Sequence, residues 1–190
     1  MNALARAQLL VIPEQIETER LILRAARADD APDAFAAVQE SANELAPWMP
    51  WVHPEPTLQG SVEFHQMAQA KWATREMLDF QWIDRANGKL LGKGGLHTIN
   101  WEVPKFEIGY WVRSSMANQG YCTEAVNALI AYSKQWLGAK RLEICSDPRN
   151  GGSRRVADRC GFTLEGILRR NMRDPYGGLR DSCMYALVFE

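Results

Sequence analysis

The sequence predicts an α/β (α+β) protein in which about seven strands form one sheet flanked by helices. Strand-like and helix-like segments alternate along the chain. An Asn87-Gly88 turn joins two strand-like segments, as in a tight hairpin, and a Pro- and Gly-containing turn at 175–178 joins two more. Because the chain has 190 residues, 46% of them hydrophobic, we expect one domain over residues 1–190 with a sizeable core.

The first part of the chain is expected to contain one strand and two helices. Leucines alternate with polar residues over 18–25, which predicts a strand. Asp29 or Asp30 can cap a helix that has Pro32 near its first turn and runs to about residue 41. A Pro- and Trp-rich segment at 46–56 interrupts this pattern. A second helix follows from residue 58 to about 75.

The rest of the chain is expected to alternate six strands with two helices. The strands are predicted at 78–84, 89–100, 105–112, 141–146, 163–172 and 179–189. One helical pattern begins after a loop at 117–125 and continues through Trp136. A shorter helix is predicted at 153–160, where Gly161 ends it.

The charge distribution argues against nonspecific nucleic-acid binding. The formal net charge is -1, whereas such binders carry a strong basic excess. Arginines nevertheless gather late in the chain and acidic residues near its start. The late arginines are Arg149, Arg154, Arg155, Arg159, Arg169, Arg170 and Arg173. An anionic ligand is therefore expected near the second half of the chain.

Cysteine spacing and hydropathy point to a cytoplasmic protein without a metal. Cys122, Cys145, Cys160 and Cys183 form no CxxC pair and no metal-ligand spacing, so we expect reduced thiols in the core. Residues 1–13 lack the apolar run of a signal peptide, and no later segment reaches the length of a membrane span. We therefore expect neither nucleic acid nor membrane as a partner.

The most informative segment is the loop at 117–125, which reads Ala-Asn-Gln-Gly-Tyr-Cys-Thr-Glu-Ala. The N–H groups at the start of a helix lack intrahelical partners, so this loop predicts an anion site, most simply for phosphate. No Lys-Ser or Lys-Thr closes it as in a nucleoside-triphosphate loop, and there is no glycine triplet for a dinucleotide. A pyrophosphate bound mainly by backbone remains, as in coenzyme A. The alternative is a Gly-containing helix entry without a ligand.

Five motifs stand in order from about residue 18 to the C-terminus. They are Glu19-Arg20-Leu21-Ile22-Leu23-Arg24, Trp48-Met49-Pro50-Trp51, Phe106-Glu107-Ile108-Gly109-Tyr110-Trp111-Val112, Gln119-Gly120-Tyr121 with Thr123-Glu124-Ala125, and Asn150 through Ser153 to Cys160-Gly161-Phe162. Together they resemble the GNAT superfamily of N-acetyltransferases, and within it the branch of bacterial ribosomal-protein N-terminal (alanine/serine) acetyltransferases. The resemblance implies a central mixed, mostly antiparallel sheet splayed between strands 4 and 5. It also implies direct transfer of acetyl from acetyl-CoA to a primary amine.

The resemblance implies that acetyl-CoA is the cosubstrate and that the loop holds its pyrophosphate. The expected contacts are Trp111, Val112, Asn118, Gln119, Gly120, Tyr121, Cys122, Thr123, Asn150, Ser153 and Arg154. The family's loop usually begins with Gln or Arg and ends with Gly or Ala, whereas Ala117 and Cys122 stand in those places here. Because such a loop binds through main-chain N–H groups, these departures should weaken the site rather than abolish it.

The resemblance also implies catalytic roles around Tyr110. A main-chain N–H at residues 110–112 is expected to donate to the thioester carbonyl oxygen. Glu107 is the first candidate for the base and His97 is the reserve. The plainer alternatives are a glutamate that pairs with an arginine or faces solvent, and a core or edge histidine. Ser153 is expected to donate to the leaving sulfur, and it can also cap the helix that follows.

The acceptor is expected to be an amine of low pKa. Deprotonating a lysine of pKa about 10.4 costs roughly 3.5 kcal/mol more than deprotonating an α-amine of pKa about 7.8. Trp48, Trp51 and His97 are expected to bind the acceptor, although the tryptophans can serve packing alone. We consider three functions: acetylation of a protein or peptide N-terminus, acetylation of a small amine such as an amino acid, polyamine or drug, and non-catalytic acyl-CoA binding. A monomer or homodimer is expected.

Overall fold

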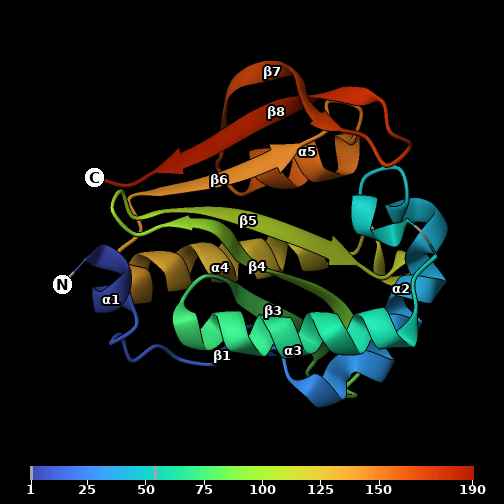
Figure 1. Cartoon of the computed structure of the whole chain (residues 1–190), viewed down its shortest axis with the longest axis horizontal. Coiled ribbons are helices and arrows are strands. Elements are labelled where there is room, and N and C mark those ends of the chain that lie inside the picture. The colour runs from blue at the N-terminus through green and yellow to red at the C-terminus, as the bar shows by residue number, and fades with distance from the viewer. Residues whose placement is uncertain (1, 54) are drawn as a thin grey trace.

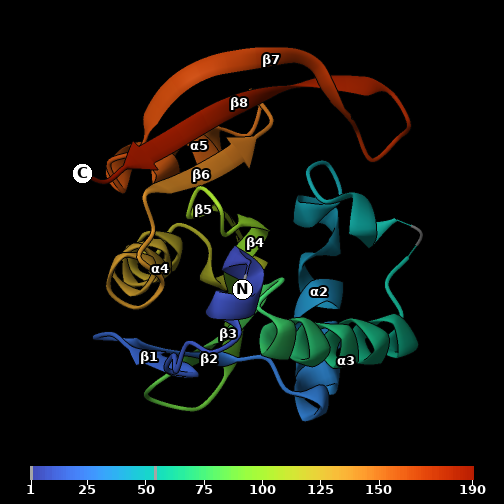
Figure 2. The same ribbon diagram turned by 60° about the vertical axis from the view of Figure 1, so that its left-hand side comes forward.

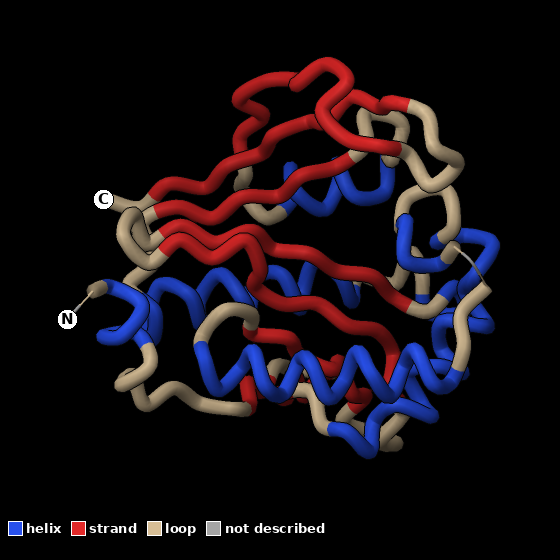
Figure 3. Tube along the Cα trace, viewed as in Figure 1, coloured by secondary structure: helices blue, strands red, loops and turns tan. Residues whose placement is uncertain are grey.

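A computed structural model describes residues 2–53 and 55–190 and contains one sheet of eight strands in the order β1-β2-β3-β4-β5-β6-β8-β7 (Figures 1 and 3). Met1 and Pro54, which belong to the predicted N-terminal and Pro- and Trp-rich segments, lie outside the described residues. The strands are β1 Gln15–Glu17, β2 Leu21–Ala25, β3 Leu78–Asp84, β4 Leu90–Asn100, β5 Lys105–Val112, β6 Arg141–Ser146, β7 Thr163–Arg173 and β8 Leu179–Val188. All neighbouring strands are antiparallel except β5 and β6. Within the described residues, no helix has the length and hydropathy needed to cross a membrane.

The described residues also form five α-helices and three short 3-10 helices, all between strands except α1, which precedes β1. The α-helices are α1 Ala3–Ala7, α2 Ala31–Leu45, α3 Leu58–Thr74, α4 Tyr121–Leu137 and α5 Gly151–Arg159. The 3-10 helices are η1 Ala28–Asp30, η2 Pro50–Val52 and η3 Ser114–Met116.

The predicted fold class is confirmed, with differences at the ends of several elements. The prediction missed the strand β1, because three residues are too short for a periodic pattern, and it missed the five-residue helix α1. Helix α2 runs four residues beyond the predicted end, to Leu45. The short helix begins at Gly151, because the side chain of Asn150 accepts a hydrogen bond from the Ser153 N–H. Ser153 as the helix cap is therefore wrong, and Asn150 has that role.

The helices cover the two faces of the sheet (Figure 2). Alternate side chains of β5 point to opposite faces, so Phe106 and Ile108 pack with α4 in one core cluster. Trp111 belongs to a second cluster with Ala34 and Val38 of α2. This alternation assigns the even-numbered residues of β5 to the α4 face and the odd-numbered residues to the α2 and α3 face.

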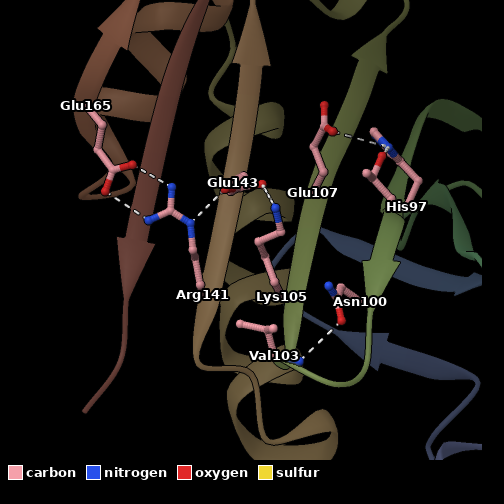
Figure 4. Close-up of polar contacts among 9 residues, drawn as sticks. His97, Asn100, Val103, Lys105, Glu107, Arg141, Glu143 and Glu165 are labelled. Carbon is pink, nitrogen blue, oxygen red and sulfur yellow. Dashed lines mark hydrogen bonds and ion pairs between the residues drawn. The ribbon is translucent and has the colours of Figure 1, made fainter. Parts of the chain in front are cut away.

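The sheet is wedged open between β5 and β6. The two strands pair in only three rows, of which the last joins Glu107 to Glu143. Beyond that row, β5 continues to Val112 without pairing to β6 in the described chain. Lys105 and Arg141 contact Glu143 at 3.2 and 2.7 Å and offset the repulsion between the two carboxylates (Figure 4). The predicted splay is therefore present. It was expected between strands 4 and 5, and these are β5 and β6 here because the structure has an additional first strand, β1.

Candidate active site

The loop before α4 presents open N–H groups on one face of the sheet. Asn118 and Gly120 adopt left-handed conformations with φ of 60° and 85°. Gly120 is the N-cap of α4, and no side chain caps the helix. The Glu124 N–H bonds to the Gly120 carbonyl, whereas the N–H groups before it have no intrahelical acceptor. This geometry fits an anion such as a pyrophosphate, and the departures at Ala117 and Cys122 leave its main-chain donors intact.

A clamp at the start of β2 holds this loop in place. The Arg20 guanidinium donates to Glu124 Oε2 at 2.7 Å and to the Gln119 carbonyl at 3.0 Å, and it lies 4.3 Å from the centre of the Tyr121 ring. Thr18 Oγ1 and the Arg20 N–H both donate to Glu124 Oε1. Sequence reasoning placed Arg20 and Glu124 in separate motifs, and only the fold brings the two motifs together.

The clamp predicts a pH-dependent contribution to stability. Burial raises the pKa of Glu124, but hydrogen bonds from Thr18 and Arg20 outweigh it and leave this pKa lowered. A lowered folded-state pKa contributes stability at neutral pH, and this contribution disappears as the carboxylate is protonated. We expect Glu124→Gln to lower the Tm at pH 7, with a smaller deficit as the pH falls below about 4. Thermal unfolding at both pH values measures this, and a deficit that does not change with pH would contradict the ionic clamp.

The wedge exposes specific amides of β5. The Arg113 N–H donates to the Leu91 carbonyl of the neighbouring strand at 2.7 Å. Since hydrogen bonds alternate along an antiparallel ladder, the Trp111 amide also faces β4 and the amides of Tyr110 and Val112 face the wedge. Trp111 was predicted among the coenzyme contacts. Its N–H faces β4, where Trp111 pairs with Lys93, and therefore does not face the wedge. Tyr110 and Val112 thus have the open donors.

Tyr110 and Ser153 meet across the wedge, on the α4 face. The Tyr110 hydroxyl lies 3.1 Å from Ser153 Oγ and 3.2 Å from the Ser153 carbonyl oxygen. Burial raises the pKa of Tyr110 above its ordinary value, so the phenol is protonated at neutral pH. Two residues predicted separately therefore form one hydroxyl pair.

The neighbouring polar residues of α5 have contacts of their own. Asn150 Oδ1 accepts from the Ser153 N–H at 3.0 Å. Arg154 donates to the Tyr185 hydroxyl and to the Pro148 carbonyl, both at 3.2 Å. These partners direct the Arg154 guanidinium toward β8 and the β6–α5 turn. A coenzyme contact by Arg154 stays a prediction.

Two thiols lie near this face, that of Cys160 in a buried residue and that of Cys122 in a partly buried one. Burial raises the pKa of Cys122 to about 12 and that of Cys160 to about 11. Both are therefore protonated at neutral pH and are poor nucleophiles. None of the four cysteines, all within the described chain, forms a disulfide. No cluster of three potential metal ligands occurs among the described residues.

A cavity of about 620 Å³ lies on the opposite face, between the sheet and helices α2 and α3. Aromatic side chains, glycines and a few polar groups line it. The lining includes Trp51, Phe64, Asp79, Lys93, Gly95, His97, Gly109 and Trp111. Trp51 and His97 line this cavity, whereas Trp48 and Glu107 do not, and an acceptor-binding role for Trp51 and His97 stays a prediction.

His97 and Glu107 lie beside each other on neighbouring strands. His97 Nδ1 and Glu107 Oε2 are 3.9 Å apart, whereas Thr98 Oγ1 lies within hydrogen-bond distance of Nδ1, at 3.1 Å (Figure 4). A β-bulge follows His97, and Thr98 there has an unfavourable φ of 49°. The ring lies over Gly109, because a Cβ at that glycine would be 2.5 Å from His97 Nε2. The bulge and the glycine together place Nε2 on the cavity floor, with Glu107 behind the ring.

Asp79 and Lys93 are polar cavity residues that sequence reasoning missed. Each lies in a strand whose other side chains are mostly buried. A usable signal was present, since Asp79 and Gln81 alternate with apolar residues and Lys93 stands between glycines. Charges in strands covered on both faces are uncommon unless they have partners or a function.

A sheet wedged open between two parallel strands, with open N–H groups at a helix start on one face and a cavity on the other, fits an acyltransferase. The donor and the acceptor can then approach the wedge from opposite sides. The chain belongs to the family described as the acetyltransferase (GNAT) domain, whose family model matches residues 20–163. It is thus an N-acetyltransferase of the GNAT type.

Known proteins similar to the chain span most of its length. It is 31% identical over 136 residues to the ribosomal-protein-serine acetyltransferase of Escherichia coli (strain K12), covering 70% of this chain and 69% of that one. It is 28% identical to an uncharacterized N-acetyltransferase of Bacillus subtilis (strain 168), with 91% and 96% covered. The crystal structure of the microcin C7 self-immunity acetyltransferase in complex with acetyl-CoA and AMP superposes with a TM-score of 0.88, at 23% identity and with 95% and 99% covered. This last likeness concerns the fold.

Proposed function

We propose that the protein transfers acetyl from acetyl-CoA to the α-amine of a protein or peptide N-terminus. The observation that carries this proposal is the wedge, because its free amides lie between an anion-binding loop on one face and an acceptor cavity on the other. The similarity to a ribosomal-protein-serine acetyltransferase supports the protein N-terminus as the acceptor class.

The loop before α4 is proposed to hold the coenzyme. The amides of residues 118–123 would bind the pyrophosphate, and Arg20 would keep the loop in its binding conformation. Bound in this way, acetyl-CoA supplies an activated acetyl thioester. Tyr110 and Val112 would donate their N–H groups to the thioester carbonyl oxygen, where negative charge develops.

His97 is proposed to accept the proton of the acceptor amine, with Glu107 as the residue that stabilises its protonated form. His97 Nε2 lies at the cavity floor, whereas Glu107 is 3.9 Å from Nδ1 and does not line the cavity. A carboxylate at this distance stabilises the cation that forms on proton uptake, while Thr98 Oγ1, 3.1 Å from Nδ1, holds the ring by a hydrogen bond. The base function predicted for Glu107 thus becomes indirect.

The Tyr110–Ser153 hydroxyl pair is proposed to protonate the leaving thiolate. Both hydroxyls lie on the α4 face, where the coenzyme would enter. We expect Ser153→Ala to reduce kcat about tenfold to a hundredfold while the Tm stays within a few degrees, because the α5 cap is supplied by Asn150. Steady-state kinetics with thermal unfolding measures both, and a changed Tm with unchanged kcat would assign Ser153 a structural role only.

A small-molecule amine is the second candidate acceptor. Trp51, Phe64 and Trp111 give the cavity an apolar aromatic lining, and its volume is within the range of small-molecule sites. Both acceptor classes use the same wedge and the same base. The two classes differ in how they occupy the cavity. A peptide would place its N-terminus there while the rest of its chain emerges, whereas a small amine would lie inside.

Free-thiol release from acetyl-CoA by the purified protein tests the proposal. The acceptor panel contains peptides with free N-termini, the same peptides with blocked N-termini, and small amines. Release that requires a free peptide N-terminus supports the proposed function. Release with small amines alone would replace it by the second candidate.

A further inference from the structure

One row of residues crosses the floor of the acceptor cavity. Asp79 on β3 pairs with Gly95 on β4, and Gly95 pairs with Gly109 on β5. The residue between Asp79 and Gly109 in this row is Gly95, which contributes no side chain. Since strands are spaced about 4.8 Å apart, Asp79 lies roughly 10 Å across the sheet from Gly109. An acceptor with its amine beside His97 can therefore extend toward Asp79.

Asp79 has an incomplete set of contacts. The residue is 7% exposed, and its Oδ2 has no hydrogen-bond donor within the described part of the chain. The nearest cation is Lys93, whose Nζ is 3.5 Å from that oxygen. The same Nζ lies 3.3 Å from the centre of the Phe64 ring, so the ammonium is shared between the carboxylate and an aromatic face.

A buried pair of this kind is costly unless another group completes it. Leaving a buried acceptor unsatisfied costs the desolvation free energy of that group, and a buried ion pair seldom stabilises a fold by itself. Both residues line the cavity, so a molecule that enters it can reach them. Open polar groups in an otherwise apolar cavity are typical of sites that select a ligand.

The pair has no net charge when both members are ionised or both are neutral. Burial disfavours a further unpaired charge beside either residue, and the same burial raises the pKa of Asp79 and lowers that of Lys93. A cationic group would meet Lys93, and an anionic group would meet Asp79. The group that fits is neutral, donates one hydrogen bond to Asp79 and accepts one from Lys93.

We propose that Asp79 and Lys93 determine acceptor specificity by binding a neutral hydroxyl or carboxamide that lies a few bonds from the reactive amine. This inference rests on the proposed function and names the chemical class of acceptor that this function takes. Apolar isosteres bind more weakly because they leave the hydrogen bonds of Asp79 and Lys93 unmade. Charged isosteres bind more weakly because Lys93 repels a cation and Asp79 repels an anion.

Matched acceptors test this specificity. Peptides that differ only in their first residue form the pairs Thr against Val, Asn against Leu and Asn against Asp, and aminobutanol against pentylamine is the small-molecule pair. We expect kcat/KM to favour the hydroxyl or carboxamide member by at least about tenfold. The double variant Asp79→Leu, Lys93→Met replaces the pair by apolar side chains of similar size and should fold. We expect it to lose the preference for Thr over Val.

The outcomes separate the inference from the proposed function. Equal kcat/KM within every matched pair, or an unchanged Thr preference in the folded double variant, would overturn the inference. Discrimination among small amines without turnover of any peptide would overturn the peptide acceptor and retain the role of the pair. Absence of turnover on every acceptor would overturn both.

A single variant covers the case in which the double variant does not fold. Asp79→Asn keeps the size of the side chain and removes its negative charge. We expect it to improve kcat/KM for the Asp-initiated peptide relative to the Asn-initiated one. A ratio equal to that of the parent protein would overturn the proposed role of Asp79.

Discussion

Replacing His97 by Gln is expected to lower kcat/KM for a peptide acceptor about a hundredfold to a thousandfold. Glutamine keeps a hydrogen-bonding side chain but cannot accept the amine proton, and a positioned general base typically contributes this much. Acetyl-CoA affinity should be unchanged, because His97 lines the cavity and the loop before α4 does not. Steady-state kinetics and calorimetric coenzyme binding measure the two quantities.

His53→Gln is the matched control for this variant. The His53 ring lies 5.3 Å from the Tyr176 ring at a tilt of 56°, and His53 does not line the cavity. We expect its kcat/KM to stay within about twofold of the parent protein. Glu107→Gln should reduce kcat/KM in the same direction as His97→Gln but by less, since Glu107 acts through His97. Unchanged kinetics in His97→Gln, or equal losses in the His53 variant, would remove His97 as the base.

Replacing Gly120 by Val is expected to weaken acetyl-CoA binding at least tenfold. Gly120 has a φ of 85°, which a β-branched residue adopts only with strain of roughly 1–2 kcal/mol or more. Its Cβ would also lie 3.4 Å from the Arg20 guanidinium that clamps the loop. A loop that relaxes from this conformation no longer directs its amides at one point. Calorimetric titration with acetyl-CoA measures the change in Kd.

Gly138→Val is the matched control at the other end of the same helix. Gly138 has a φ of 63°, and nothing lies within 4 Å of the position of its Cβ. Both variants therefore carry similar backbone strain and should lose similar stability, but only Gly120→Val should bind the coenzyme more weakly. Equal Kd values for the two variants would argue against the loop as the coenzyme site.

Much of the fold was predictable because its signals lie in neighbouring residues. The strand 78–84 was predicted with its observed bounds, since the Asn87-Gly88 turn marks the hairpin that it begins. The helix start after Gly120 was predicted from the glycine and the helical pattern behind it, and the anion site proposed there stays a prediction. Errors occurred where the local signal was weak, as at the three-residue strand β1.

The arrangement of the site depended on pairing register. A shift of one residue moves every side chain of a strand to the other face, and the sequence does not state this register. The register between β4 and β5 decides that the amides of Tyr110 and Val112 face the wedge and that the amide of Trp111 does not. The bulge after His97 similarly places its ring over Gly109, with Glu107 behind it.

The sequence by itself determined the fold class, the order of most elements, the loop before α4 and the resemblance to the acetyltransferase family. These features depend on turn residues, periodicity and short motifs, which act between residues close in the chain. Only the tertiary structure decided which residues meet: Arg20 with Glu124 across 104 positions, Tyr110 with Ser153 across 43, and Asp79 with Lys93 at the cavity floor. Such contacts arise from strand register and from the packing of helices on the sheet, and no local signal in the chain encodes them.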